Sequence, residues 1–138
     1  MRKTRPTSPG RVLEEDQPLS RSLVWRLQRE FLDRQGVTAW RAGIVPSFIA
    51  SNAWMANAYA QVVLGWLRDA HSASAALDPE QPLYVVELGS GSGRFGYLFI
   101  TRLLELLECS SLPELAVRYV FSDAAEGNLE FLRGHPFL

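Results

Sequence analysis

The sequence is poor in the residue types that build disulfide frameworks and metal clusters. It contains one cysteine, Cys109, and two histidines, His71 and His135, among 138 residues. One cysteine cannot form an internal disulfide, and neither histidine stands at ligand spacing from a second metal-binding residue. We therefore expect no metal site. Because Cys109 lies among leucines, we expect a buried or half-buried structural thiol and not a nucleophile.

A strong charge of one sign and a long apolar run are also missing. The formal net charge is -1, which gives no general attraction to nucleic acids or anionic membranes. No apolar run is long enough to span a bilayer. The basic N-terminus lacks the apolar stretch of a secretory signal. The sequence thus predicts a cytoplasmic protein with neither a nucleic-acid nor a membrane partner, and a length that fits one domain.

Composition divides the chain into three parts. Residues 1–18 are rich in Pro, Arg, Ser and Thr, which is typical of a flexible leader. Residues 19–78 form a helical segment. Its first helix is expected over Ser20–Gln35, capped by Ser20 and ended by Gly36. A second helix is expected to start at a Ser51 cap and to run to about Asp69.

Large aromatic and small side chains suggest how this helical segment packs. Ala53, Ala56 and Ala60 would let the second helix approach a neighbour closely. The segments predicted to be loops are Val37–Phe48 and His71–Pro82. We expect the four tryptophans to anchor the core of the segment, since large aromatics dominate burial; they are Trp25, Trp40, Trp54 and Trp66.

The third part, residues 79–138, reads as strand, helix, strand, helix. Leu83–Leu88 is a short, nearly continuous apolar run, typical of a strand buried on both faces of a parallel sheet. A helix is expected over Arg94–Glu108, a second strand over Val117–Phe121, and a last helix from about Ala124. This order predicts an α/β fold in which a Rossmann-like parallel sheet follows the N-terminal helices.

A glycine cluster, Gly89-Ser90-Gly91-Ser92-Gly93, joins the first strand to its helix. Such a turn needs backbone angles that side chains disfavour, and it lets a ligand approach the main chain. The N–H groups at the start of the helix are free to bind anionic groups. In open α/β sheets, ligands bind beyond the carboxyl ends of the strands. The cluster is therefore the candidate cofactor site.

The cluster can be interpreted in two ways. Residues 91–96 fit the dinucleotide pattern GxGxxG, whereas residues 87–93 fit ExGxGxG. A carboxylate at Glu87 would repel a pyrophosphate but would suit a sulfonium or an ammonium group. Asp123 ends the second strand, where a carboxylate can accept hydrogen bonds from ribose hydroxyls in either case. Two structural alternatives stay open: Glu87 could pair with an arginine, and Asp123 could only cap the next helix.

The stretch Glu87–Gly93 resembles motif I of class I (Rossmann-like) S-adenosylmethionine-dependent methyltransferases, and Asp123 falls at their second acidic motif. Further stretches resemble a bacterial group of methyltransferases: Ser22–Gln28, Ala39–Pro46, Ala50–Asn52 and Asp123–Phe131. More distantly, the layout is similar to the MidA-like methyltransferases, related to the mitochondrial complex I assembly arginine methyltransferase. Those proteins have a Thr-Ser-Pro-like turn where this sequence has Ala50-Ser51-Asn52-Ala53.

The resemblance implies S-adenosylmethionine as cofactor, with the residues that hold it being Glu87, Gly89, Ser90, Gly91, Gly93 and Asp123. It implies methyl transfer to an unknown acceptor, with protein arginine suggested by the distant resemblance, and it identifies no catalytic base. It also implies a seven-stranded sheet, of which about two strands are present, so we expect a truncated N-terminal portion with uncovered sheet edges open to association. The rival hypotheses are a fragment of an NAD(P)-binding oxidoreductase and a non-catalytic remnant or interaction module.

Overall fold

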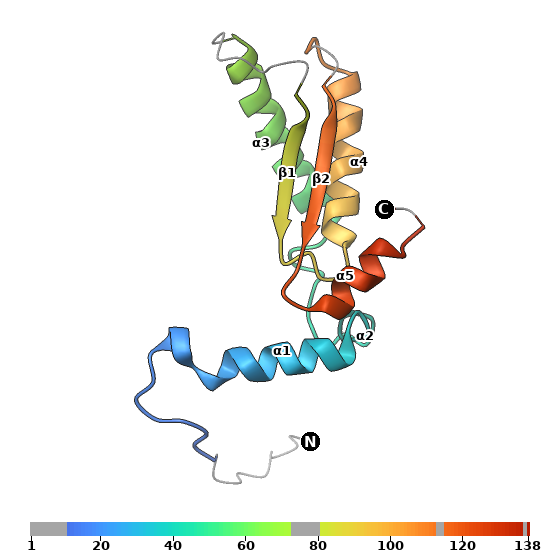
Figure 1. The fold of residues 1–138 in the computed structure, drawn as a ribbon. Coiled ribbons are helices and arrows are strands. Elements are labelled where there is room, and N and C mark those ends of the chain that lie inside the picture. Colours follow the sequence, from blue (N-terminus) through green and yellow to red (C-terminus); the bar gives the residue numbers. More distant parts are fainter. Residues whose placement is uncertain (1–10, 73–80, 113–114, 137) are drawn as a thin grey trace, which may run out of the picture.

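The computed structural model describes residues 11–72, 81–112, 115–136 and 138. Helices and strands alternate in the second half of the chain, after a helical first half (Figure 1). The expected α/β fold with N-terminal helices is thereby confirmed. In chain order the elements are η1 (Leu19–Arg21), α1 (Leu23–Gln35), α2 (Thr38–Arg41), α3 (Ala53–Ser72), β1 (Leu83–Leu88), α4 (Arg94–Glu108), β2 (Val117–Ser122) and α5 (Glu126–Arg133).

The described strands form a two-stranded parallel sheet. β1 and β2 pair in register along their whole length, from Leu83 opposite Val117 to Leu88 opposite Ser122. The helix α4 connects them, as the βαβ prediction requires, and its bounds agree with those predicted. Because the strands are parallel and in register, their carboxyl ends finish level, beside each other.

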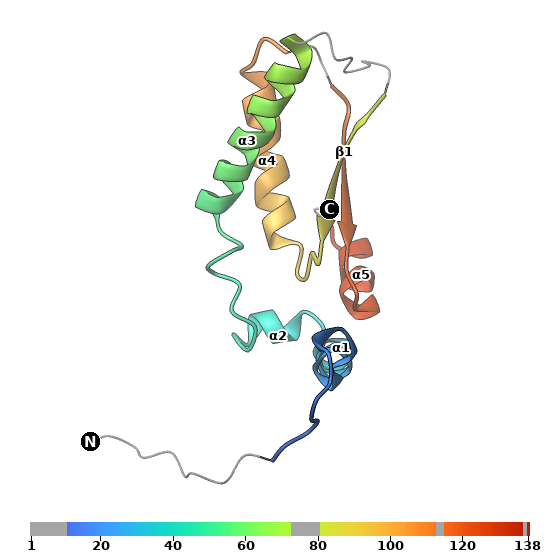
Figure 2. The same cartoon turned by 90° about the vertical axis from the view of Figure 1, so that its left-hand side faces the viewer.

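The core lies between the sheet and two helices. α3 and α4 pack side by side on one face of the sheet (Figure 2). The buried residues at their contact are Ala56 and Ala60 of α3 with Phe99 and Leu103 of α4. These small alanine side chains allow the bulky side chains of α4 to fit closely against α3. The predicted packing role is thus confirmed for Ala56 and Ala60, whereas Ala53 is exposed.

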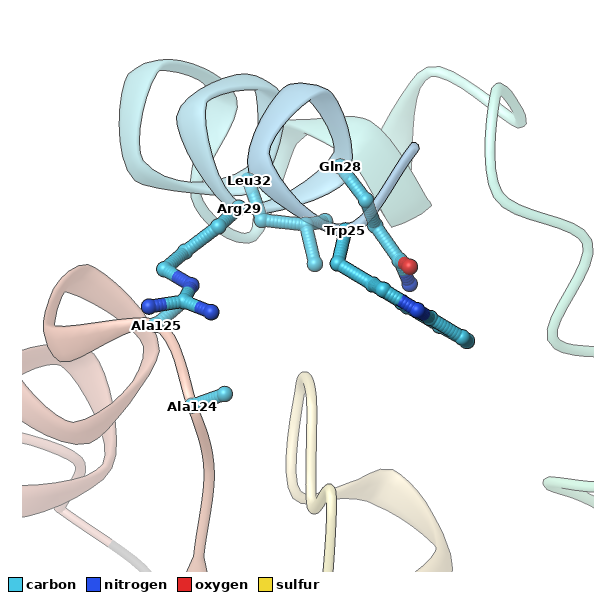
Figure 3. A pocket seen from close by; sticks show the side chains of 6 residues that line it. All are labelled: Trp25, Gln28, Arg29, Leu32, Ala124 and Ala125. Atoms are coloured by element: carbon cyan, nitrogen blue, oxygen red, sulfur yellow. The ribbon is translucent and has the colours of Figure 1, made fainter. Parts of the chain in front are cut away.

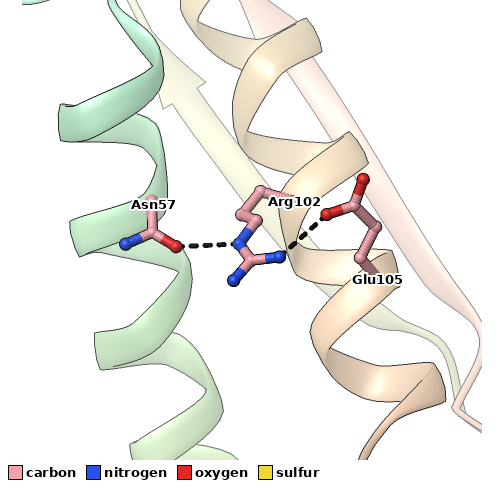
Figure 4. A network of polar contacts seen from close by, with 3 residues as sticks. All are labelled: Asn57, Arg102 and Glu105. Atoms are coloured by element: carbon pink, nitrogen blue, oxygen red, sulfur yellow. Dashed lines mark hydrogen bonds and ion pairs between the residues drawn. The ribbon is translucent and has the colours of Figure 1, made fainter.

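A polar contact fixes the two helices along their length. The Arg102 Nε of α4 donates a hydrogen bond to Asn57 Oδ1 of α3 at 2.8 Å. The same guanidinium lies 2.9 Å from the Glu105 carboxylate one turn along α4 (Figure 4). The arginine therefore joins a partner on the neighbouring helix to a partner on its own.

The second face of the sheet is open. Tyr84, Val86 and Leu88 of β1 are 56%, 57% and 85% exposed. The prediction that β1 is buried on both faces is therefore wrong. α3 and α4 cover the face that carries Val85 and Glu87, and no described element covers the whole of the opposite face.

Helix α1 begins later than predicted. Ser20 lies in the short 3-10 turn η1, and Ser22 is the residue that caps α1, its Oγ accepting a hydrogen bond from the N–H of Val24 at 3.2 Å. The predicted end is confirmed, since Gly36 follows the helix with φ of 50°, a conformation that favours glycine. The short helix α2 falls inside a segment that was predicted to be a loop; four residues are too few to show a helical period.

Helix α3 is capped by Asn52 and not by Ser51. The Asn52 Oδ1 accepts a hydrogen bond from the N–H of Met55 at 3.0 Å, and the helix runs to Ser72, three residues beyond the prediction. The predicted loop from His71 therefore starts later, and its residues 73–80 lie outside the described residues. Residues 1–10 of the predicted leader also lie outside them, and 11–18 are exposed.

Two expectations about burial are wrong. Trp25, Trp54 and Trp66 are 45%, 74% and 54% exposed, and only Trp40 is half-buried. They lie on faces of α1 and α3 that no described element covers completely. Cys109 is exposed and directly follows the last residue of α4.

The helices α1 and α2 lie beyond the carboxyl ends of the strands (Figure 1). α1 packs against α5, which follows β2 and begins at Glu126, two residues after the predicted start. The Arg41 guanidinium of α2 lies 5.9 Å from the centre of the Phe131 ring of α5. The helices α1 and α2 therefore lie at the carboxyl ends of the strands, where ligands of α/β proteins bind.

Candidate functional site

The glycine loop between β1 and α4 forms the centre of the candidate site. Gly89, Gly91 and Gly93 have φ angles of 76°, 54° and 73°, in the left-handed region that residues with a Cβ disfavour. The alternating glycines of the ExGxGxG pattern are thus the ones that the backbone of this turn requires. Gly96 has an ordinary helical conformation and has a different role, which is close packing.

Gly96 lets α4 lie directly on the sheet. A Cβ at this position would come within 2.5 Å of Phe121 and 2.7 Å of Tyr119, both on β2. A dinucleotide loop also uses its third glycine for close helix–strand packing. The packing at Gly96 therefore suits both interpretations of the loop, whereas the backbone angles suit the alternating pattern.

The Ser90 side chain is buried and bonds within the protein. Its Oγ donates to the carbonyl of Ser122 at 3.2 Å and accepts from the N–H of Ser122 at 3.1 Å. The serine therefore attaches the glycine loop to the end of β2. Its predicted contact with a cofactor stays a prediction, and the hydroxyl already has partners on the neighbouring strand.

Asp123 bonds to the glycine loop across the sheet. Its Oδ2 accepts a hydrogen bond from the N–H of Gly91 at 2.7 Å. Its Oδ1 accepts from the N–H of Ala125 at 2.9 Å and from the Asn128 side chain at 3.1 Å. The structural alternative, in which Asp123 organises the start of the next helix, therefore holds in part. Since a carboxylate oxygen can accept two hydrogen bonds, Oδ2 keeps capacity for a ligand hydroxyl.

Glu87 lies on the helix-covered face of the sheet. Its Oε2 is buried and has no hydrogen-bond partner among the described residues. A Cβ on Gly96 would lie 2.8 Å from that oxygen, which places the carboxyl group beneath α4. Sequence reasoning expected it to face the ligand. The structure places it behind the glycine loop, because the alternation of β1 groups Glu87 with Val85 on the face covered by α3 and α4.

Burial perturbs the ionisation of Glu87 and of its neighbour Tyr119. Burial raises the pKa of the Glu87 carboxyl above its usual value; the nearby hydroxyl groups of Tyr119 and Ser90 oppose this rise, and the charge of Asp123 adds to it. Burial likewise raises the pKa of the Tyr119 phenol, and the Glu87 charge raises it further. The pair borders an apolar cavity of about 220 Å³ beneath β1, with Phe95 and Phe99 among its walls.

The helices α1 and α2 lie beside the glycine loop and the segment that follows β2. The Trp40 ring of α2 lies against Gly91, so that a Cβ there would come within 2.8 Å of the ring. A cavity of about 300 Å³ lies between α1 and the segment that follows β2. Figure 3 shows its lining: Trp25, Gln28, Arg29 and Leu32 from α1, with Ala124 and Ala125.

The sequence interpretation assigned no site residue to α1. The signal was present as Trp25, Gln28 and Arg29, at positions i, i+3 and i+4, which share one helix face. That face becomes part of a site only because α1 packs on α5, about a hundred residues further along the chain. No short-range pattern contains this contact.

The described residues contain no group of three or more His, Cys, Asp or Glu side chains that could hold a metal ion. Among them there is also no helix with the length and apolar content needed to cross a membrane. Comparison with protein-family models, with curated proteins and with solved structures gives no match to this chain.

Proposed function

We propose that this chain binds S-adenosylmethionine and is the cofactor-binding, N-terminal portion of a class I methyltransferase. One observation carries the proposal. Three alternating glycines with left-handed backbone angles join a parallel strand to a helix, and an aspartate at the end of the neighbouring strand is bonded to their middle member. A location in the cytoplasm is part of the same proposal.

The residues present fit such a ligand. Free N–H groups in the first turn of α4 can bind the carboxylate of the methionine moiety, as helix N-termini bind anions generally. The remaining acceptor capacity of Asp123 Oδ2 suits a ribose hydroxyl. When bound, this donor supplies a methyl group already activated by the sulfonium. The task of the protein is then to hold the donor and the acceptor in line.

The dinucleotide hypothesis is the rival. Gly96 packs as the third glycine of that fingerprint would. Because Glu87 lies on the covered face of the sheet, its carboxylate would not face a pyrophosphate bound at the loop, and its charge no longer speaks against one. The backbone of the loop favours the alternating pattern. Because Gly89 directly follows the last residue of β1, the turn begins at the first glycine of ExGxGxG.

Calorimetric titration of the 138-residue chain with S-adenosylmethionine, and separately with NAD, tests the proposal. Saturable binding of the first ligand alone is expected. Gly89→Ala should weaken binding by about tenfold or more, which is ~1.4 kcal/mol, because it strains the loop. Gly43→Ala is the matched control, since both glycines have positive φ and nothing within 4 Å of an added Cβ. A folded chain that binds NAD alone, or neither ligand, would overturn the proposal.

A second candidate function, an interaction module, is favoured by one separate observation. The apolar side chains of Tyr84, Val86 and Leu88 are exposed together on one face of β1. Exposed strands of this kind associate readily with other chains. The two candidates are compatible, since the open face and the glycine loop are different parts of the molecule.

A further inference from the structure

The cavity between α1 and the segment after β2 has the size and lining of a small-molecule site. Its volume of about 300 Å³ is at the lower end of the range for ligand pockets. Ala124 and Ala125, which directly follow Asp123, form one wall, and Trp25 and Leu32 form much of the other (Figure 3). A ligand whose sugar reached Asp123 would therefore have this cavity beside it.

The Trp25 ring is fixed in orientation. Its Nε1 donates a hydrogen bond to the carbonyl of Leu19 in the preceding turn at 2.6 Å. The one polar group of the indole is thus satisfied within the protein, and the remaining surface is flat and apolar. The side chain is nevertheless 45% exposed and lines the cavity. A fixed, half-exposed aromatic face of this kind is a platform for stacking.

Arg29 differs from the other arginines of α1. Arg26 lies 3.8 Å from the Glu30 carboxylate, and Arg34 donates to the Glu30 carbonyl at 3.0 Å. Arg29 makes no ion pair or hydrogen bond within the described part of the chain, and neither does Gln28. Both unpaired side chains line the cavity beside Trp25. A guanidinium donates hydrogen bonds, and an amide both donates and accepts them, so together they can bind the edge of a heterocycle.

We propose that this cavity binds the flat heteroaromatic base of a nucleoside, with Trp25 as the stacking face and with Gln28 and Arg29 at the edge of the base. The inference rests on the proposed function, since that function supplies the nucleoside. It assigns to the N-terminal helix the selection of the base, while the glycine loop and Asp123 hold the rest of the donor. Without α1, the site would lack one of its two walls.

The test uses adenosine, S-adenosylmethionine and methionine as separate probes in calorimetric titrations of the full chain. Trp25→Ala should weaken binding of adenosine and of S-adenosylmethionine by about tenfold or more, because it removes the aromatic face on which the base stacks. Methionine, which has no base, should be unaffected. Trp54→Ala is the matched control, since Trp54 is exposed on α3 and does not line the cavity.

Tryptophan fluorescence gives a second test, which does not depend on whether the Trp25→Ala variant folds. Stacking of a base on an indole quenches its fluorescence, so adenosine should quench the wild type and Trp54→Phe but should quench Trp25→Phe much less. Arg29→Gln should weaken adenosine binding less than Trp25→Ala does, because it removes edge contacts and keeps the stacking face.

The outcomes separate this inference from the proposed function. If S-adenosylmethionine binds equally well to the wild type and to folded Trp25→Ala, the base site is wrong and the donor function stands. If adenosine or NAD binds with dependence on Trp25 while S-adenosylmethionine does not bind, the base site stands and the donor function is wrong. If the folded wild type binds none of these probes, both are overturned.

Discussion

The N–H of Gly91 donates a hydrogen bond to Asp123 Oδ2 at 2.7 Å, although 32 residues separate the two. This bond joins the turn after β1 to the end of β2. The same carboxylate organises the start of α5 through Ala125. One side chain therefore connects three segments of the candidate site. Its removal should lower both the stability of the protein and its affinity for a ligand at this site.

Asp123→Asn should destabilise the protein. An amide presents one acceptor and one donor where the carboxylate presents two acceptors, so either Gly91 or Ala125 loses its partner. An unsatisfied buried group costs ~1–3 kcal/mol, and denaturant unfolding can measure a loss of this size. The control is Asp33→Asn, on the exposed surface of α1, which should be near neutral. Equal stability of the two variants would show that the Asp123 contacts contribute nothing.

Two helical glycines should respond in opposite directions to alanine. Gly96→Ala places a Cβ within 2.5–2.8 Å of Phe121, Tyr119 and Glu87, and overpacking of this kind costs ~1–3 kcal/mol. Gly65→Ala in α3 meets nothing within 4 Å and should stabilise by ~0.5–1 kcal/mol, because alanine favours helix. Thermal unfolding of both variants gives the comparison. A stabilising Gly96→Ala would contradict the close packing of α4 on the sheet.

Glu87→Gln should stabilise the protein near neutral pH. The folded state raises the pKa of this carboxyl above 4.5, so it holds the proton more tightly than the unfolded chain. The stability that this provides is complete below about pH 4.5 and is lost as the pH rises through the raised pKa. The difference in melting temperature between Gln and wild type should therefore be small in acid and should grow by a few degrees towards neutral pH.

The exposed Glu108 at the end of α4 provides the control for that pH profile. Glu108→Gln makes the same change at an exposed side chain, and the stabilisation by Glu87→Gln towards neutral pH should exceed that of Glu108→Gln. A Glu87 variant whose profile follows that of Glu108→Gln would mean that its carboxyl group is not perturbed by burial. Binding of S-adenosylmethionine to Glu87→Gln should be nearly unchanged, because the side chain lies behind the loop and not in the cavity.

Val86→Lys should reduce self-association of the chain. Val86 is 57% exposed in the middle of the open face of β1, and burying a valine side chain contributes ~1.5 kcal/mol or more. Sedimentation of the wild type should show concentration-dependent association that the lysine weakens by about tenfold. Val62→Lys changes an equally apolar, exposed position of α3 and should have little effect. A wild type that stays monomeric would remove the support for an interaction module.

The elements that the sequence predicts well are those whose causes are local. β1, α4 and β2 each follow from the spacing of apolar residues within a few turns or positions. The positive φ angles of Gly36 and of the loop glycines follow from the need for a residue without a Cβ. Residues within a short stretch of the chain determine these properties.

The predictions that were wrong concern which faces of the strands and helices are covered, and by which elements. These properties depend on contacts between segments that lie far apart in the sequence. The alternation of β1 groups Glu87 with Val85, but the packing of α3 and α4 decides that this face is the covered one. Trp25 and Trp54 have the size of core residues, yet they lie on surfaces that other elements leave open. The cavity beneath α1 arises from a contact with α5 that no sequence window includes.

The register of the two paired strands sets the relative positions of the residues that form the candidate site. Leu88 lies opposite Ser122, so β1 and β2 end at the same level of the sheet. The residues that follow them can therefore come close enough for the hydrogen bond between Gly91 and Asp123. A slip of one residue would move one strand end by ~3.3 Å along the other, which would take the two groups out of hydrogen-bonding distance. It would also exchange the two faces of the slipped strand and bury what is now open. Errors of pairing would thus disrupt the candidate site and the packed core together.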